Sequence, residues 1–502
     1  MTPRERRRWW WRPRHLGVVA ACIGCLLVPL TDGIGRAPVG VSDWERELAR
    51  IDEAIADLAR PIDERALHGL RAPSPWPSPP PGAREPKRPP LPLDVGRGTA
   101  AGEPSASGNP GERERAQGRG EGGASVRALS TLEAAGAAGP AGLATTRFAF
   151  LLYHRGGLTG SACDLTAAGE ALDRSIRAGE APDDLYLLKA KLDFRGHRVA
   201  AAKADLAMLS GRADRVQVDL LKADVFLQEG RYADARQGYE SVLARARPWD
   251  ALARLAYLES RTGEPAVADR LYAASQEEMS AKEMRAYAWV ELQRGLLRLG
   301  RGQYDDAMAR YRTARRAYSG DWVVDEHIAE LLGAQKKFDE AAALYERIVA
   351  RVPRPELQQA LGDLYVFMGR RDLAAPWHAK ALTAYLESAG RGEVLYYHHL
   401  ASFYADVRED GPAAVRWARR DADLRNTFAT QEMLAWALYR DQRVDEAFAQ
   451  ITKPLAAGVV DAHLFFHAAM ISLAAGRGHD GARLLRRAAD VNPRYAAFHV
   501  HR

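Results

Sequence analysis

The residues that come closest to a chemical site are two histidines, His463 and His467, four positions apart in a stretch with helical periodicity. This spacing places both imidazoles on one face of a helix, where both can reach one metal ion. No third ligand follows at a suitable distance, and histidines that only pack or cap a helix also occur at this spacing. The pair is therefore only a weak metal candidate, and the sequence predicts no cofactor.

The three cysteines offer little further chemistry. Cys22 and Cys25 form a C-x-x-C pattern, but it lies in an apolar run, has no second pair for zinc and lacks the histidine that follows in haem attachment. Val19–Cys22 resembles a bacterial lipobox, which makes Cys22 a weak lipidation candidate. Cys163 has no evident histidine partner and is expected to be a small buried residue.

Charge and motifs argue against catalysis and against nucleic-acid binding. No P-loop, dinucleotide-binding glycine motif, nucleophile elbow or zinc-protease motif occurs at a credible place, so the chain is not expected to be an enzyme. The net charge is +6, but six arginines fall within the first fifteen residues. The remainder has almost no positive excess to attract phosphates.

An N-terminal targeting segment is predicted at residues 1–35. An arginine-rich start precedes an apolar run from Leu16 to Leu30, the order of an export signal or signal anchor. The run is short for a membrane span, so cleavage to a secreted form, lipidation and retention all stay open. Retention is favoured, with the N-terminus cytoplasmic and the remainder in the periplasm or cell envelope.

Two segments of different character follow. Within residues 42–70, apolar side chains from Trp44 to Leu58 recur every three or four positions, which predicts a short amphipathic helix. Self-association through residues 44–58 is one alternative for this helix, and packing on another element is the other. Residues 71–142 are rich in proline and then glycine, which predicts a long disordered linker.

From residue 183 onward the chain is organised as an internal repeat of 33 to 39 residues. Alanine, with one glycine, stands five residues after each predicted turn, and a large side chain usually stands nine residues after it. A small residue stands seven residues before each turn. Lys189 and Asp205, both in the first repeat, are the exceptions to the last two rules. The turns are placed at Gly196, Gly230, Gly263, Gly302, Lys336, Gly369, Arg408, Gln442 and Gly476.

This spacing resembles that of the tetratricopeptide repeat (TPR) family, including Leu361-Gly362, Tyr365 and the closing prolines Pro353 and Pro493. The resemblance implies an all-α, right-handed α-solenoid of about nine or ten helix pairs over residues 183–502. Residues 143–182 look like a degenerate first pair. The C-terminal end, with Tyr495 and Phe498, is predicted either to fold back as a cap or to mediate self-association.

In the family, the residue just after the small position, six before the turn, faces the concave groove. Carried over, this rule predicts a partner groove with acidic, apolar and aromatic side chains, suited to an extended protein or peptide segment. Paired asparagines for a carboxylate clamp are absent from these positions. The groove candidates are Asp224, Tyr257, Glu330, Asp363, Ser402, Trp436 and, on the same helix as Trp436, Tyr439.

The sequence therefore predicts a non-catalytic interaction scaffold that meets the membrane only through its N-terminal segment and faces the periplasm. One alternative is an accessory protein of cell-envelope polysaccharide synthesis or export, in which Tyr257, Trp436 and Tyr439 stack on sugars. A second is a cytoplasmic TPR regulator. Fusion of a reporter after residue 502 separates the second alternative from the others.

Overall fold

The computed structural model describes residues 41–59, 140–177, 182–262 and 264–498. The targeting segment predicted at 1–35, Cys22 and nearly all of the linker predicted at 71–142 lie outside the described residues. The chain divides into two compact units, Met1–Val41 and Ser42–Arg502, and every helix and contact described below belongs to the second. Within the described ranges, no helix is both long and apolar enough to cross a membrane.

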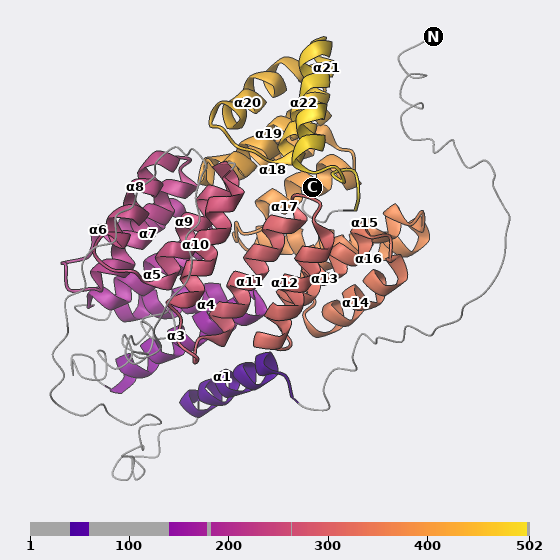
Figure 1. Ribbon diagram of the computed structural model, residues 1–502. Helices are drawn as coiled ribbons and strands as arrows, with labels where there is room; N and C mark the ends of the chain where they lie inside the picture. The colour runs from indigo at the N-terminus through magenta and orange to yellow at the C-terminus, as the bar shows by residue number, and fades with distance from the viewer. Residues whose placement is uncertain (1–40, 60–139, 178–181, 263, 499–502) are drawn as a thin grey trace, which may run out of the picture. The chain divides into compact units, whose positions relative to one another are not determined.

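In its described residues this unit contains twenty-one α-helices, one π-helical turn and no β-strand. After α1, the helices follow one another as ten pairs, each packed on the next, which confirms the predicted all-α array (Figure 1). The helices are α1 (Asp43–Ala59), α3 (Pro140–Thr159), α4 (Ala162–Arg177), α5 (Asp183–Arg195), α6 (Val199–Ala207), α7 (Arg215–Gln228), α8 (Tyr232–Leu243), α9 (Trp249–Thr262), α10 (Pro265–Glu277), α11 (Met284–Leu299), α12 (Tyr304–Ala317), α13 (Trp322–Ala334), α14 (Phe338–Arg351), α15 (Pro355–Phe367), α16 (Arg371–Gly390), α17 (Tyr397–Ser402), the π-helical turn η3 (Phe403–Val407), α18 (Gly411–Leu424), α19 (Phe428–Arg440), α20 (Val444–Ala456), α21 (Ala462–Ala474) and α22 (Gly478–Val491).

In the pairs whose turn residues are described, the turn depends on one residue with left-handed backbone. Gly230, Gly302 and Gly476 have φ of 75°, 70° and 75°, a conformation that glycine adopts without steric cost. Lys336 and Gln442 occupy the same position with φ of 64° and 65°. At these five predicted turns the chain therefore reverses between paired helices.

In the first full repeat the turn lies one residue later than the sequence suggests. Gly196 has φ of −79°, whereas His197 has φ of 60°. Counted from His197, the small position is Ala190 and the large position is Leu206, and both are buried. Lys189 and Asp205 are therefore no longer exceptions, because they lie next to the packing positions.

A second shift of one residue accompanies the π-helical turn η3. A π-helical turn adds one residue to a helix without ending it. The left-handed residue that follows is Glu409, with φ of 53°, instead of Arg408. Two intervals between predicted turns are 39 residues long, namely Gly369–Arg408 and Gly263–Gly302. The length of the first is explained by α16, which has 20 residues. The other is taken up by the loop at 278–283 and by α11, which has 16 residues.

The core between neighbouring pairs is built from tyrosine and alanine. Tyr239, Tyr272, Tyr311 and Tyr345 follow their turns by nine residues and are at most 1% exposed. The alanines five residues after these turns are fully buried, so the second helix of each pair packs closely on the first. Each helix pair thus buries its apolar face against its neighbours, as repeat arrays do.

Contacts also join repeats that are far apart in the sequence. The Asn426 amide donates to Gln228 O at 2.7 Å, and the Val460 amide donates to Arg261 O at 3.2 Å. Arg494 Nη1 donates to Gly302 O at 3.2 Å, across 192 residues. Turns within three consecutive pairs, α7–α8, α9–α10 and α11–α12, therefore meet the loops that precede or follow much later pairs, in the same order along the chain.

The C-terminal end folds back onto the array. Phe498 is 3% exposed, and its ring lies 5.8 Å from that of Phe367 on α15. It also occupies the space next to Gly333 on α13 that a Cβ atom would need. Of the two alternatives predicted for this end, the structure shows the folded-back one.

Candidate binding cavity

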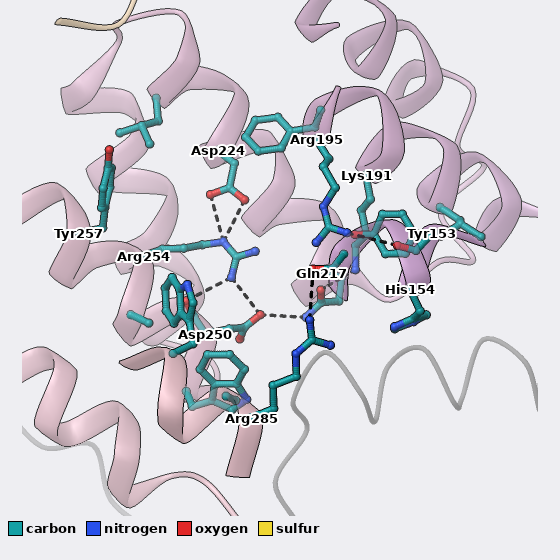
Figure 2. Close-up of a pocket in the computed structure, with 18 of the residues that line it drawn as sticks. Tyr153, His154, Lys191, Arg195, Gln217, Asp224, Asp250, Arg254, Tyr257 and Arg285 are labelled. Carbon is teal, nitrogen blue, oxygen red and sulfur yellow. Dashed lines mark hydrogen bonds and ion pairs between the residues drawn. The ribbon is translucent and has the colours of Figure 1, made fainter. Parts of the chain in front are cut away.

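A cavity of about 1120 Å³ lies against the first helices of four successive pairs, α5, α7, α9 and α11 (Figure 2). Helix α3 and the first turns of α13 and α19 complete its wall, together with Trp44 and Glu47 of α1. Its volume is at the upper limit of small-molecule pockets and suits a short peptide segment.

A chain of hydrogen bonds crosses the cavity wall from helix to helix. Lys191 Nζ on α5 donates to Gln217 Oε1 on α7 at 2.8 Å. Gln217 Nε2 donates to Asp250 Oδ2 on α9 at 3.3 Å, and Arg254 Nη1 donates to the same oxygen at 3.1 Å. Arg254 Nε lies 3.0 and 2.9 Å from the two oxygens of Asp224. These bonds hold polar side chains of three adjacent helices in fixed positions.

The innermost member of this network is Tyr239 on α8. Its hydroxyl donates to Asp224 Oδ1 at 2.8 Å, and the residue is 1% exposed. Burial and the neighbouring Asp224 carboxylate raise the pKa of Tyr239 well above 10. Tyr239 therefore remains a neutral donor, and it orients the carboxylate that faces Arg254.

Aromatic rings supply the apolar part of the wall. Trp249 and Trp289 lie with ring centroids 6.5 Å apart, and Trp289 is 41% exposed. Arg261 lies over the rings of both Tyr257 and Phe428, at 5.4 and 5.6 Å. The cavity thus presents exposed ring surface next to ordered donors and acceptors.

Sequence reasoning missed one row of wall residues. The groove rule selects a single position six residues before each turn, but one face of a helix also includes the position seven residues earlier. The residue at this earlier position, thirteen before the turn, also lines the cavity in the first helix of five successive pairs. These residues are Asp184, Gln217, Asp250, Trp289 and Val323. A seven-residue step back from Asp224 and Tyr257 identifies two of them from the sequence alone.

Of the predicted groove residues, Asp224 and Tyr257 line the cavity. Glu330 is 1% exposed, with Oε2 lying 2.9 Å from His327 Nδ1 inside the array. Asp363 Oδ1 lies 2.9 Å from His378 Nε2. Ser402 is half-buried at the end of α17. These last three residues do not line this cavity.

Trp436 and Tyr439 also lie elsewhere, on α19. Trp436 is 9% exposed, its indole N–H donates to Asp406 Oδ1 at 3.0 Å, and its ring stacks on His467 at 4.1 Å. Its ring face and its edge are therefore both engaged within the chain. The Tyr439 ring lies 5.0 Å from that of Trp436.

The weak metal pair and the lone cysteine can also be placed. The rings of His463 and His467 are 6.4 Å apart, and His467 Nδ1 lies 2.9 Å from Glu432 Oε1. Among the residues that the structure describes, no group of three or more potential ligands is arranged to hold a metal ion. Cys163 is exposed, so the expectation of a buried residue is wrong. It lies in the first turn of α4, beside the packing positions Asp164 and Leu165.

Residues 298–364, from the end of α11 into α15, match the family model described as "Tetratricopeptide repeat". The chain therefore contains tetratricopeptide repeats. A TPR array has the fold of a protein–protein interaction scaffold, and the family is typically non-catalytic.

Many solved structures are similar to this chain, including the following two, and no curated protein sequence matches it. One is the crystal structure of a tetratricopeptide repeat protein from Parabacteroides merdae, with 17% identity, a TM-score of 0.28 and coverage of 48% of this chain and 93% of that one. The other is the crystal structure of the APC/C hetero-tetramer Cut9-Hcn1, with 16% identity, a TM-score of 0.35 and coverage of 73% and 78%.

Proposed function

We propose that this protein is a non-catalytic scaffold that binds an extended segment of a partner protein in the cavity formed by α5, α7, α9 and α11. The observation that carries the proposal is the row of ordered donors, acceptors and rings contributed by these successive helices. TPR arrays bind partners along the first helices of their pairs, and the cavity is lined by the corresponding helices here.

The balance of charge indicates what kind of segment fits. Seven carboxylate residues and seven lysine or arginine residues line the cavity. A peptide backbone carries one donor and one acceptor per residue, so it can pair with carboxylates such as Asp250 and with cations such as Lys191 and Arg195. Trp289 and Tyr257 suit its apolar side chains. A strongly charged polymer would meet as many repulsive as attractive groups.

We further propose that the scaffold is tethered to the cytoplasmic membrane and faces the periplasm. The support is the arginine-rich start followed by the apolar run from Leu16 to Leu30. A reporter fused after residue 502 tests this topology. Activity of a periplasmic reporter supports the proposal, whereas activity of a cytoplasmic reporter alone favours the cytoplasmic TPR regulator.

The test of partner binding is site-specific photo-cross-linking in cells that produce the full chain. A photoreactive amino acid replaces Trp289, which is 41% exposed in the cavity. The matched control replaces Leu386, which is 39% exposed on α16 and outside the cavity. We expect a discrete cross-linked protein with the cavity probe alone. Identical products at both positions, or none at Trp289, would refute a cavity partner.

A second candidate, an accessory protein of cell-envelope polysaccharide synthesis or export, is supported by the exposed ring of Trp289 and by Tyr257 in the same cavity. Sugars stack on such rings. The Trp436 ring is engaged within the chain, so sugar binding is expected to depend on Trp289. Glycan binding that Trp289→Ala abolishes and Trp436→Phe leaves intact would favour this candidate.

A further inference from the structure

Helix α1 docks on the array through one buried anchor. Among residues 42–58, Trp44 alone is buried, with 4% of its surface exposed. Its indole N–H donates to Leu158 O at 3.1 Å, and the Trp322 indole donates to the same oxygen at 2.8 Å. Arg351 lies 5.0 Å above the Trp44 ring. A central aromatic anchor in a pocket, surrounded by half-exposed contacts, is typical of peptide recognition.

Asp43, the residue before Trp44, is bound by the loop between α12 and α13. Ser319 donates to Asp43 Oδ2 through its amide at 2.9 Å and through its hydroxyl at 2.8 Å. The Trp44 amide donates to Ser319 O at 3.1 Å. Gly320, with φ of 82°, lets Ser42 approach so closely that a Cβ atom there would overlap its side chain. The loop is thus shaped to accept an Asp-Trp pair at a helix start.

One turn later, Glu47 links α1 to the cavity. Its Oε2 accepts from the Tyr318 hydroxyl at 2.5 Å, and its Oε1 accepts from Arg285 Nη1 at 3.0 Å. Arg285 also donates to Gly157 O at 3.3 Å. Glu47, Trp44 and Arg285 are all part of the cavity wall. Removing α1 would therefore take two residues out of that wall.

We propose that the surface formed by Leu158, Arg285, Tyr318–Trp322 and Arg351 is a recognition site for a helix start with the pattern Asp-Trp-x-x-Glu. In this chain its occupant is α1, which binds reversibly and closes one side of the cavity. Residues 60–139 lie between α1 and α3 in the sequence, so α1 stays tethered to the same chain when it leaves the site. The biological role of this closure rests on the proposed partner binding, but the site itself does not.

The test uses the full chain with Cys22, Cys25 and Cys163 changed to serine. A single reporter cysteine replaces Ala286, a half-buried cavity residue next to Arg285. The control reporter replaces Ala309, an exposed residue on α12 outside this cavity. A thiol reagent then measures how fast each cysteine is modified. Amide hydrogen exchange of α1 reports separately whether the helix is docked.

We expect Trp44→Ala to abolish the protection of α1 and to raise the modification rate at position 286 by about tenfold or more, without affecting position 309. A synthetic peptide of residues 41–59 added to the Trp44→Ala chain should restore the slow rate. The same peptide with alanine in place of Trp44 should bind at least about thirtyfold more weakly. Changing the exposed Glu53 to alanine in the peptide should have no such effect.

Loss of α1 protection without faster modification at position 286 would overturn the closure of the cavity. Retained protection in Trp44→Ala, or equal binding of the two peptides, would overturn the recognition site. The variant Asp43→Ala/Glu47→Ala, which leaves the anchor in place, is expected to act in the same direction, and rescue by the peptide shows that the array is folded. No partner is needed, so failure here is distinct from failure of the cross-linking test.

Discussion

Replacement of Asp224 by alanine tests whether the cavity network is built as described. The change removes the acceptor of the buried Tyr239 hydroxyl, which costs about 1–3 kcal/mol for an unsatisfied buried group. It also removes one of two carboxylates from Arg254, whose guanidinium keeps Asp250 at 3.1 Å. Because one partner remains, the additional loss falls below the roughly 3–5 kcal/mol of a broken buried ion pair. We therefore expect Asp224→Ala to lower the free energy of opening of the surrounding helices by about 2–4 kcal/mol in total.

Asp224→Asn gives the matched comparison. An asparagine keeps the Oδ1 atom that accepts from Tyr239 and Arg254 Nε, and it removes only the charge. We expect it to cost about 1–2 kcal/mol less than alanine. Asp234→Ala on α8, where the aspartate pairs with Arg231 at the surface, should cost less than about 0.5 kcal/mol.

The assay is native-state hydrogen exchange of the α7, α8 and α9 amides, because an array of this length need not unfold in one step. The variants should lower the free energy of opening in these three helices and leave α19–α22 nearly unchanged. The reasoning is refuted if Asp224→Ala costs no more than Asp234→Ala. If Asp224→Asn and Asp224→Ala lowered the free energy of opening by the same amount, the hydrogen bond from Tyr239 would contribute nothing to it.

Two further predictions concern other parts of the array. Gly230→Ala and Gly476→Ala impose the same strain at φ of 75°, but a Cβ at Gly230 also overlaps the Asn426 carbonyl, whereas one at Gly476 meets nothing within 4 Å. Gly230→Ala should therefore expose the Asn426 amide to exchange, and equal exchange in both variants would refute that contact. Burial raises the pKa of Glu326 from 4.5 to about 7, so this residue lowers stability as pH rises through that range. In the free energy of opening of α13, measured by hydrogen exchange, wild type should lose on the order of 3 kcal/mol relative to Glu326→Gln between pH 4.5 and pH 8, and parallel pH profiles would contradict this.

The sequence predicted the repeat because its spacing follows from local packing. A buried alanine and tyrosine at fixed distances from a left-handed turn are required wherever two helices pair. The first repeat was misplaced by one residue because glycine was taken to mark the left-handed position, whereas His197 holds it. The π-helical turn before Glu409 likewise leaves no trace in the spacing, since it adds a residue within one helix.

The cavity could be predicted only in part, for two physical reasons. Asp224 and Tyr257 follow from the repeat rule, but Trp44 and Phe428 join the wall through contacts across long stretches of chain, which no periodic pattern encodes. The rule also assumes that every residue on the inner face is open to a partner. Glu330 and Trp436 are instead bonded to other residues of the chain, because distant repeats touch.

The contacts between distant repeats also limit how many repeats this protein can have. Tyr232 meets Phe428 across 196 residues, and Gly302 meets Arg494 across 192. In an open solenoid, gain or loss of one 34-residue repeat only changes the length of the array. Here, an insertion or deletion between Gly302 and Phe428 would displace every later loop by one repeat from the turn that it contacts. Repeat gain or loss in this lineage is therefore expected at the ends of the array, and an engineered array with an added internal repeat should lose several of these contacts at once.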